Sequence, residues 1–279
     1  MSPDQTRPAR LPDLVKAFAG TAQAVVDLGH ACSADDLAQP TECPGWTVHD
    51  QISHVVGVEA WLGGRTDPRV KMPSYEHIRN DLGKKVEYAV EVRRSRTGAE
   101  VLAELEDVLT QRLQTLKDPM LTDTSLIAGP FGPDQATTVV LLRTFDVWTH
   151  EQDIRSALGR PGNLDSPAAA VVVNSVMLAL PKVIAKFAAV APGHLVVIDV
   201  TGPFVARQVF QVEVDDQGRP RGRAISGRLP DGPATTISLS TESFTRRAAG
   251  RRSVSDTPYG VVGEDAIARR VLEGLVLTH

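Results

Sequence analysis

The chain contains few cysteines. Its 279 residues include only two, Cys32 and Cys43, and their spacing forms no CxxC pair. Two thiols at this spacing cannot by themselves make a structural zinc site, nor can they build the disulfide framework of a small secreted protein. We therefore expect both thiols to be unoxidised in a reducing cytoplasm and to have structural or incidental roles.

A large charge of one sign is also lacking. The formal net charge is −4, which gives no electrostatic reason to expect nucleic acid or an anionic membrane as a partner. One short basic cluster occurs at residues 246–252 (RRAAGRR), beside a helical pattern. We interpret it as a solvated face or loop in preference to an anion site.

Long apolar stretches are not evident. The sequence suggests no run of 18 apolar residues that would span a bilayer, and its start (MSPDQTRPARLPDLVKAF) has no apolar core after a basic segment. The expectation from these two features is a cytoplasmic protein without a signal peptide or a membrane span.

The remaining composition is that of a folded protein, with 42% hydrophobic and 23% charged residues. The length favours two domains. The first, over residues 1–165, shows apolar residues at helical spacing and is predicted to be an up-and-down helix bundle. Its helices are expected at 11–28, 47–62, 74–93, 98–117 and 136–158.

The pattern changes in the second predicted domain, residues 166–279. An apolar helix is expected at 166–189, kinked or broken by Pro181. Beyond it, alternating β-branched residues predict strands, and two short helices close the chain, which makes this domain α+β. The strands are expected at 194–201, 205–214 and 235–240, and the helices at 241–249 and 266–275.

Two histidines in apolar helical patterns are the main functional signal. Asp50 precedes His54 by four residues, and Asp146 precedes His150 by four. Residues at this spacing share one face of a helix. Imidazoles and carboxylates from two helices can converge on one metal ion. In the alternative, each histidine is a core residue that hydrogen-bonds the aspartate one turn before it.

Other charged residues near these histidines are weaker candidates. Glu59 can face the bundle interior or be a solvated helix residue. Arg143 can neutralise Asp146 or meet a substrate carboxylate, or it can pair with an acid on the helix surface. Asp153, three residues after His150, can orient that imidazole.

Two stretches carry a resemblance to a known family. Residues 43–59 (CPGWTVHDQISHVVGVE) and 143–162 (RTFDVWTHEQDIRSALGRPG) resemble the actinobacterial mycothiol-dependent maleylpyruvate isomerases. The resemblance implies a DinB-like four-helix bundle over residues 1–165 and a sterol-carrier-like α+β domain over 166–279. The helix-then-strand order of this chain is similar.

The same resemblance implies a divalent metal, usually zinc, with His54, Asp146 and His150 as its ligands. The family's acid is often glutamate, and Asp146 is one methylene shorter, so the metal would lie closer to its helix. Asp50 is then a capping residue or an outer partner of His54. The family also uses an arginine of the C-terminal domain near the metal, and Arg207, Arg223 and Arg228 all remain open for that role.

The function implied is thiol chemistry. Two histidines and one carboxylate leave a coordination position open, which in this family takes mycothiol as the thiol cosubstrate. The expected activity is isomerisation of maleylpyruvate or S-transfer to other small electrophiles, with Arg143 and Glu59 as candidate catalytic residues. The ligand set would also suit Fe(II). The alternative is a non-catalytic carrier or sensor that contains a metal and binds an apolar small molecule.

Overall fold

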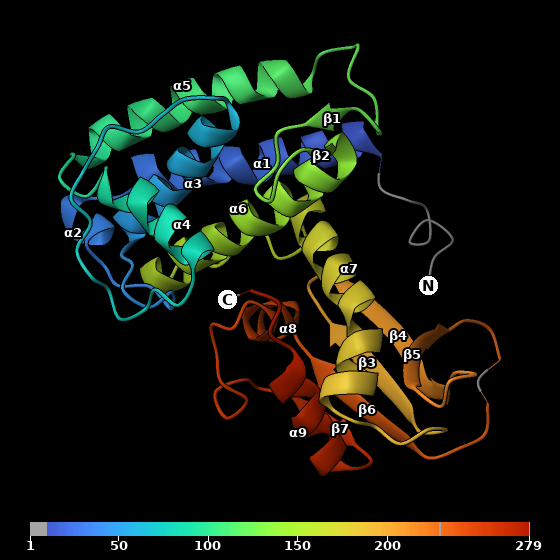
Figure 1. Cartoon of the computed structure of the whole chain (residues 1–279). Helices are drawn as coiled ribbons and strands as arrows, with labels where there is room; N and C mark the ends of the chain where they lie inside the picture. The colour runs from blue at the N-terminus through green and yellow to red at the C-terminus, as the bar shows by residue number, and fades with distance from the viewer. Residues whose placement is uncertain (1–9, 229, 279) are drawn as a thin grey trace. The chain divides into compact units, whose positions relative to one another are not determined.

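The computed structural model describes residues 10–228 and 230–278 and divides the chain into two compact units after Gly162 (Figure 1). The first unit is helical, and the second combines helices with a mixed β-sheet. The predicted fold class, a helix bundle followed by an α+β part, is therefore confirmed.

Four long helices form the bundle of the first unit. Helix α1 packs against α5 and α6, and α3 packs against the same two helices from the other side. Helices α1 and α5 bury mainly apolar residues at helical spacing, whereas α3 is buried on nearly all sides and α3 and α6 also bury polar residues. Their bounds are Leu11–His30 for α1, Val48–Leu62 for α3, Gly98–Leu116 for α5 and Ala136–Leu158 for α6.

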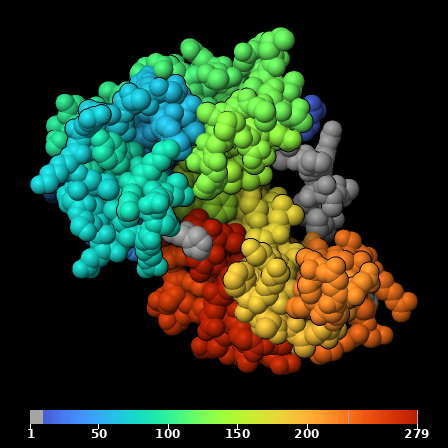
Figure 2. Space-filling view, in the orientation of Figure 1, coloured from blue at the N-terminus to red at the C-terminus, as the bar shows by residue number. Residues whose placement is uncertain are grey.

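Shorter elements complete this unit. Helix α2 (Ala34–Leu37) precedes α3, and the strands β1 (Leu126–Ile127) and β2 (Asp134–Gln135) pair before α6. Helix α4 (Asp81–Glu91) is shorter than predicted, because Asn80 caps its N-terminus through a hydrogen bond from the Gly83 amide. Figure 2 shows α4 and the segment before it, in light blue to cyan, on the outer face of the bundle.

The second unit is built on a five-stranded sheet. Its strand order is β5-β4-β3-β6-β7, with β3 and β6 parallel and the other pairs antiparallel. The sequence pattern predicts β3, β4 and β6 but not β5 and β7, which are edge strands without a fully buried residue. The bounds are Leu195–Thr201, Val205–Val214, Pro220–Ile225, Ala234–Leu239 and Gly260–Val262 for β3 to β7.

Helices pack against the sheet. Helix α7 (Pro167–Lys182) contacts β4 and β5, α8 (Thr241–Ala248) contacts β3 and β6, and α9 (Asp265–Gly274) contacts β6 and β7. Pro181 does not break its helix, since α7 continues into a π-helical turn, η2 (Val183–Phe187). One face of the sheet presents Val196, Phe210 and Ile237, all at most 1% exposed, to the core of this unit.

The prediction about apolar stretches was wrong. The helical span Pro167–Phe187 is long and apolar enough to cross a bilayer, with a mean hydropathy of 1.9. Half of the most apolar 18-residue stretch of this span is buried inside the structure. The core helix of a water-soluble protein can be equally long and apolar, so the span is weak evidence for a membrane.

The basic cluster at residues 246–252 is also corrected. Arg246 and Arg247 are 2% and 8% exposed, so this part of the cluster is neither a solvated face nor a loop. The guanidinium of Arg247 donates to the backbone carbonyls of Leu272, Glu273 and Arg252. It thereby satisfies carbonyls at the C-terminus of α9, which have no partner within the helix.

Candidate metal centre

The start of α3 is set by a capping box. The Thr47 hydroxyl accepts a hydrogen bond from the Asp50 amide, and the Asp50 carboxylate accepts one from the Thr47 amide at 2.9 Å. Arg94 also donates to Asp50 at 3.2 Å. Of the two roles predicted for Asp50, capping residue or outer partner of His54, the structure therefore shows the first. Its carboxylate bonds the Thr47 amide and Arg94 at the helix start.

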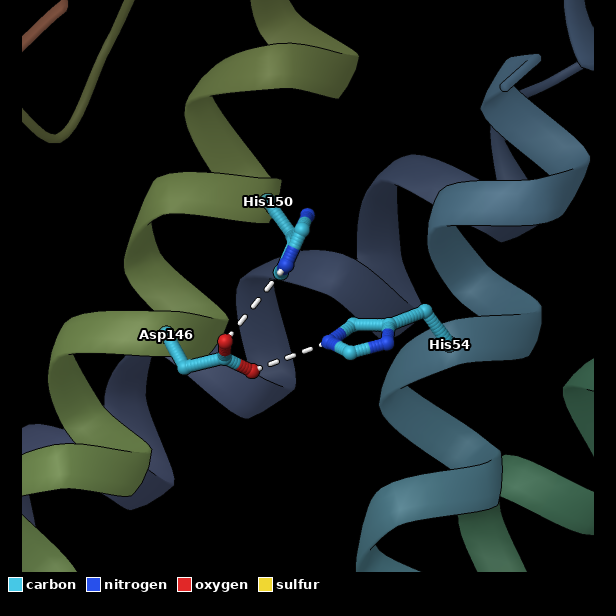
Figure 3. Close-up of side chains that lie close together, drawn as sticks. All are labelled: His54, Asp146 and His150. Atoms are coloured by element: carbon cyan, nitrogen blue, oxygen red, sulfur yellow. Dashed lines mark hydrogen bonds and ion pairs between the residues drawn. The ribbon is translucent and has the colours of Figure 1, made fainter. Parts of the chain in front are cut away.

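Helices α3 and α6 bring the predicted ligand residues together. His54 Nε2 lies 3.0 Å from Asp146 Oδ2, and His150 Nε2 lies 3.6 Å from Asp146 Oδ1. All three side chains point into the space between the two helices (Figure 3). One donor atom from each lies within 4.8 Å of the others. The alternative in which each histidine pairs with its own aspartate is wrong for His54, because its partner Asp146 comes from the other helix.

Burial is uneven across the three side chains. The side chains of His54 and His150 are 5% and 8% exposed, while that of Asp146 is 33% exposed. Trp46, itself buried, lies with its ring centroid 5.1 Å from that of His54 and 5.8 Å from that of His150. The indole thus covers the imidazoles on one side, and the site is accessible beside Asp146.

Charge favours an ionised carboxylate here. Burial alone would raise the pKa of Asp146, but the positive charge of Arg143 and the two imidazoles hold it well below its ordinary value. Burial, together with His150, lowers the pKa of His54 to about 4. His54 is therefore neutral at pH 7, which is the form that binds a metal.

His150 responds differently. Burial would lower its pKa, but Asp146 and Asp153 outweigh that effect and raise it. Its Nδ1 lies 2.5 Å from Gln51 Oε1 and 3.3 Å from Asp153 Oδ2. Asp153 was singled out from the sequence, whereas Gln51 was missed. Gln51 could have been found from its position three residues before His54, which places it on the same side of α3.

A buried ionic cluster lies behind Asp146. Arg143 donates from Nη1 to Asp146 Oδ2 at 2.8 Å and from Nε to Glu59 Oε1 at 2.6 Å. Arg112, which the sequence did not suggest, donates to Glu59 Oε2 at 3.1 Å. Glu59 is 0% and Arg143 3% exposed, so the surface interpretation of each is wrong. Arg143 does neutralise Asp146, as proposed from its spacing.

The three arginines considered from the C-terminal domain belong to the second unit, and the two cysteines belong to the first. Arg207 and Arg223 form exposed ion pairs on the sheet, with Asp199 and Glu213 respectively, and Arg228 is exposed. Cys32 and Cys43 form no disulfide in the described part of the chain. Burial raises the pKa of the Cys32 thiol, which makes it a poor nucleophile.

The donor set fits a divalent transition metal. Two imidazole nitrogens and one carboxylate oxygen are ligands of zinc and of Fe(II), and three protein donors leave positions open for an exogenous ligand. His150 has the outer acceptors that ligand histidines usually have. For His54, in contrast, no residue in the described part of the chain forms a hydrogen bond with Nδ1.

Fold and site together define a two-unit protein in which a helix bundle carries a candidate His–Asp–His metal centre. Residues 4–155 match the family model described as the mycothiol maleylpyruvate isomerase N-terminal domain. This match covers more than half of the chain, and the chain belongs to that family. The resemblance stated from residues 43–59 and 143–162 is thereby confirmed.

One solved structure supports the fold. A crystal structure of a mycothiol-dependent maleylpyruvate isomerase with a histidine-to-alanine substitution has a TM-score of 0.52 and 15% identity, covering 91% of this chain and 94% of that chain. The crystal structure of the isomerase without the substitution has a TM-score of 0.49 and 14% identity, and it again covers 91% of this chain and 94% of that chain. At 15% identity, the likeness to the first of these structures shows a shared fold only. No curated protein matches this sequence.

Proposed function

We propose that this protein is a metal-dependent enzyme that uses a low-molecular-weight thiol to isomerise small electrophiles or to transfer sulfur to them. The convergence of His54, Asp146 and His150 within 4.8 Å carries the proposal. The family supports a thiol of the mycothiol type, and maleylpyruvate is the first substrate to test.

The three residues are proposed as the metal ligands, with zinc as the metal. A bound zinc ion lowers the pKa of a thiol that it coordinates, so that a thiolate is present at neutral pH. The Asp146 side chain is 33% exposed, and this is the side from which we propose that a thiol reaches the centre.

The proposed isomerisation balances without another reactant. The thiolate sulfur adds to a conjugated cis double bond, and the resulting single bond rotates. Breaking the C–S bond then re-forms the double bond as trans and returns the thiolate. In the S-transfer variant the C–S bond stays and a proton is taken up at carbon.

Arg143 and Glu59 are proposed to act through Asp146. Both are at most 3% exposed, so neither is placed to touch a substrate. Arg143 holds the Asp146 carboxylate in position, and Glu59 holds the Arg143 guanidinium. By drawing charge from Asp146, Arg143 would make this carboxylate a weaker electron donor toward a bound metal, which would then be a stronger Lewis acid. Trp46 shields the imidazoles from water.

We further propose that the protein works in the cytoplasm, with small electrophiles and the thiol as its small-molecule partners. The test is elemental analysis of the native protein, followed by a turnover screen with mycothiol and other thiols against maleylpyruvate and generic electrophiles. Turnover that requires both metal and thiol, and that is lost in Asp146→Asn, is expected. Equal turnover without any thiol would exclude the mechanism. Tight binding of an apolar compound with no turnover would instead favour the carrier.

A further inference from the structure

A buried amide joins the two helices that carry the candidate ligands. Gln51 lies on α3 and its residue is 0% exposed. Its Oε1 lies 2.5 Å from His150 Nδ1 on α6, and its Nε2 donates to Thr41 Oγ1 at 2.7 Å. The Gln51 side chain therefore fills the space between the loop before α3 and the ring of His150.

Thr41 determines which end of the amide faces His150. Its hydroxyl donates to the Trp46 carbonyl at 2.9 Å and accepts from the Cys43 amide at 3.2 Å. Since a hydroxyl has a single proton, the Gln51 atom beside it has to be a donor, which is Nε2. With the amide reversed, two carbonyl oxygens would compete for that proton.

The amide orientation fixes the tautomer of His150. Gln51 Oε1 can only accept, so the neutral ring carries its proton on Nδ1. The Asp153 carboxylate, 3.3 Å from the same nitrogen, favours the same tautomer. The lone pair is then on Nε2, the nitrogen that faces Asp146. An imidazole binds a metal through the nitrogen that carries no proton.

We infer that Gln51, oriented by Thr41, is a positioning residue that presets the tautomer and the ring orientation of His150 for metal binding. This inference rests on the proposed metal centre. It also gives α3 a second role there, because the helix that contributes His54 orients the imidazole on α6 as well.

The first test measures affinity for Co²⁺ alone, by competition with a chromophoric chelator. Gln51→Leu should bind Co²⁺ about 10–100-fold more weakly than the native protein. Gln51→Glu keeps an acceptor toward Nδ1 but puts a second oxygen beside the Thr41 hydroxyl in place of Nε2, so it should lose less affinity than Gln51→Leu. Gln152→Leu is the matched control, since Gln152 is buried on α6 but bonds the Gly162 carbonyl. Native affinity in Gln51→Leu, or equal loss in Gln51→Glu, would overturn the inference.

A second pair of variants leaves Gln51 in place. Thr41→Val removes the hydroxyl that orients the amide and should weaken Co²⁺ binding, whereas Thr41→Ser keeps it and should not. Equal affinities in these two variants would contradict the role given to Thr41. Circular dichroism on all variants checks that the helices are intact.

The metal-free protein provides a readout that is independent of activity. Two-bond ¹H–¹⁵N NMR correlations at alkaline pH should show the Nδ1–H tautomer of His150, assigned by their loss in His150→Gln. A ring protonated on Nε2 would overturn the inference. Should the native protein bind no Co²⁺, the proposed metal centre fails, while this measurement still decides the tautomer.

Discussion

At the scale of single residues, the two Asp-x-x-x-His steps have different tasks although their sequences look equivalent. Asp50 is engaged at the start of α3, while Asp146 lies between two imidazoles. The difference comes from position within each helix. Asp50 is the third residue of its helix, where backbone amides lack partners, and Asp146 lies mid-helix, where only side chains remain to bind it.

His150 gives the first prediction. His150→Ala should abolish stoichiometric metal binding and leave the helix content unchanged, because one of three donors is lost while alanine favours a helix. Elemental analysis and far-UV circular dichroism measure the two effects. His30→Ala is the control, since His30 is exposed and lies beside Glu106, away from the candidate ligands. Full metal content in His150→Ala would refute the ligand assignment.

Glu59 gives a prediction on stability. Glu59→Gln leaves the buried guanidinium of Arg112 without a countercharge and should lower the free energy of unfolding by about 3–5 kcal/mol. Urea denaturation measures it. The comparison change Glu106→Gln, at an exposed contact with His30, should cost less than about 1 kcal/mol. Similar losses in both variants would show that the buried cluster contributes little.

At the scale of elements, close packing of α3 on α4 depends on a glycine. A Cβ on Gly57 would lie 2.5 Å from the Ala89 Cβ, a distance that real Cβ atoms essentially never show. The two helix backbones can approach this closely only because Gly57 has no side chain.

Alanine substitutions test this contact. Gly57→Ala should destabilise the protein by about 1–3 kcal/mol through overpacking. Gly20→Ala, on α1 with nothing within 4 Å of the added Cβ, should stabilise it by about 0.5–1 kcal/mol. Thermal unfolding of the two variants gives the signs. A stable Gly57→Ala protein would mean that α4 can shift without cost.

A second element-scale feature is the attachment of α4 to the loop that carries Trp46. Glu87 on α4 accepts hydrogen bonds from Trp46 Nε1 at 2.8 Å and His77 Nε2 at 2.7 Å and pairs with Arg94. Burial alone would raise the pKa of Glu87, but these partners outweigh it and hold the pKa below its ordinary value of 4.5.

The sign of this shift predicts a pH dependence. A carboxylate whose pKa is lower in the folded state stabilises the fold above its unfolded pKa, and that contribution is lost as the pH falls below about 4.5 through the folded pKa. The difference in urea midpoint between the native protein and Glu87→Gln should therefore be largest near neutral pH and shrink in acid. A difference independent of pH would contradict the ionised state of Glu87.

At the scale of the whole molecule, all three proposed ligands belong to the unit that ends at Gly162. A ligand that binds only the folded form of one unit stabilises that unit, by about 2.7 kcal/mol at a concentration 100 times its Kd. The second unit has a separate core around its sheet.

Metal removal tests this division. Calorimetry of the full chain should show two transitions, and chelation should lower the temperature of one and leave the other unchanged. Far-UV circular dichroism assigns the sensitive transition to the helical unit. A single transition that moves as a whole would show that the two units unfold together.

The sequence by itself determined much of the local structure and the chemistry of the site. Helical periodicity and capping residues placed α1, α3, α5 and α6 almost to the residue, because both signals act within a few positions along the chain. The i,i+4 step on α6 put Asp146 and His150 on one face for the same reason. Strands β5 and β7 escaped prediction because edge strands with mostly exposed residues show little alternation.

Only the tertiary structure decided which groups meet. His54 and Asp146 are 92 positions apart, and their contact depends on how α3 packs against α6. The packing of α3 against α5 and α6 buried Glu59 between Arg112 and Arg143, and its packing against α6 placed the Gln51 amide against His150. A sequence pattern shows that a face is apolar and does not show which face it will pack against, because burial is favourable against any complementary apolar surface.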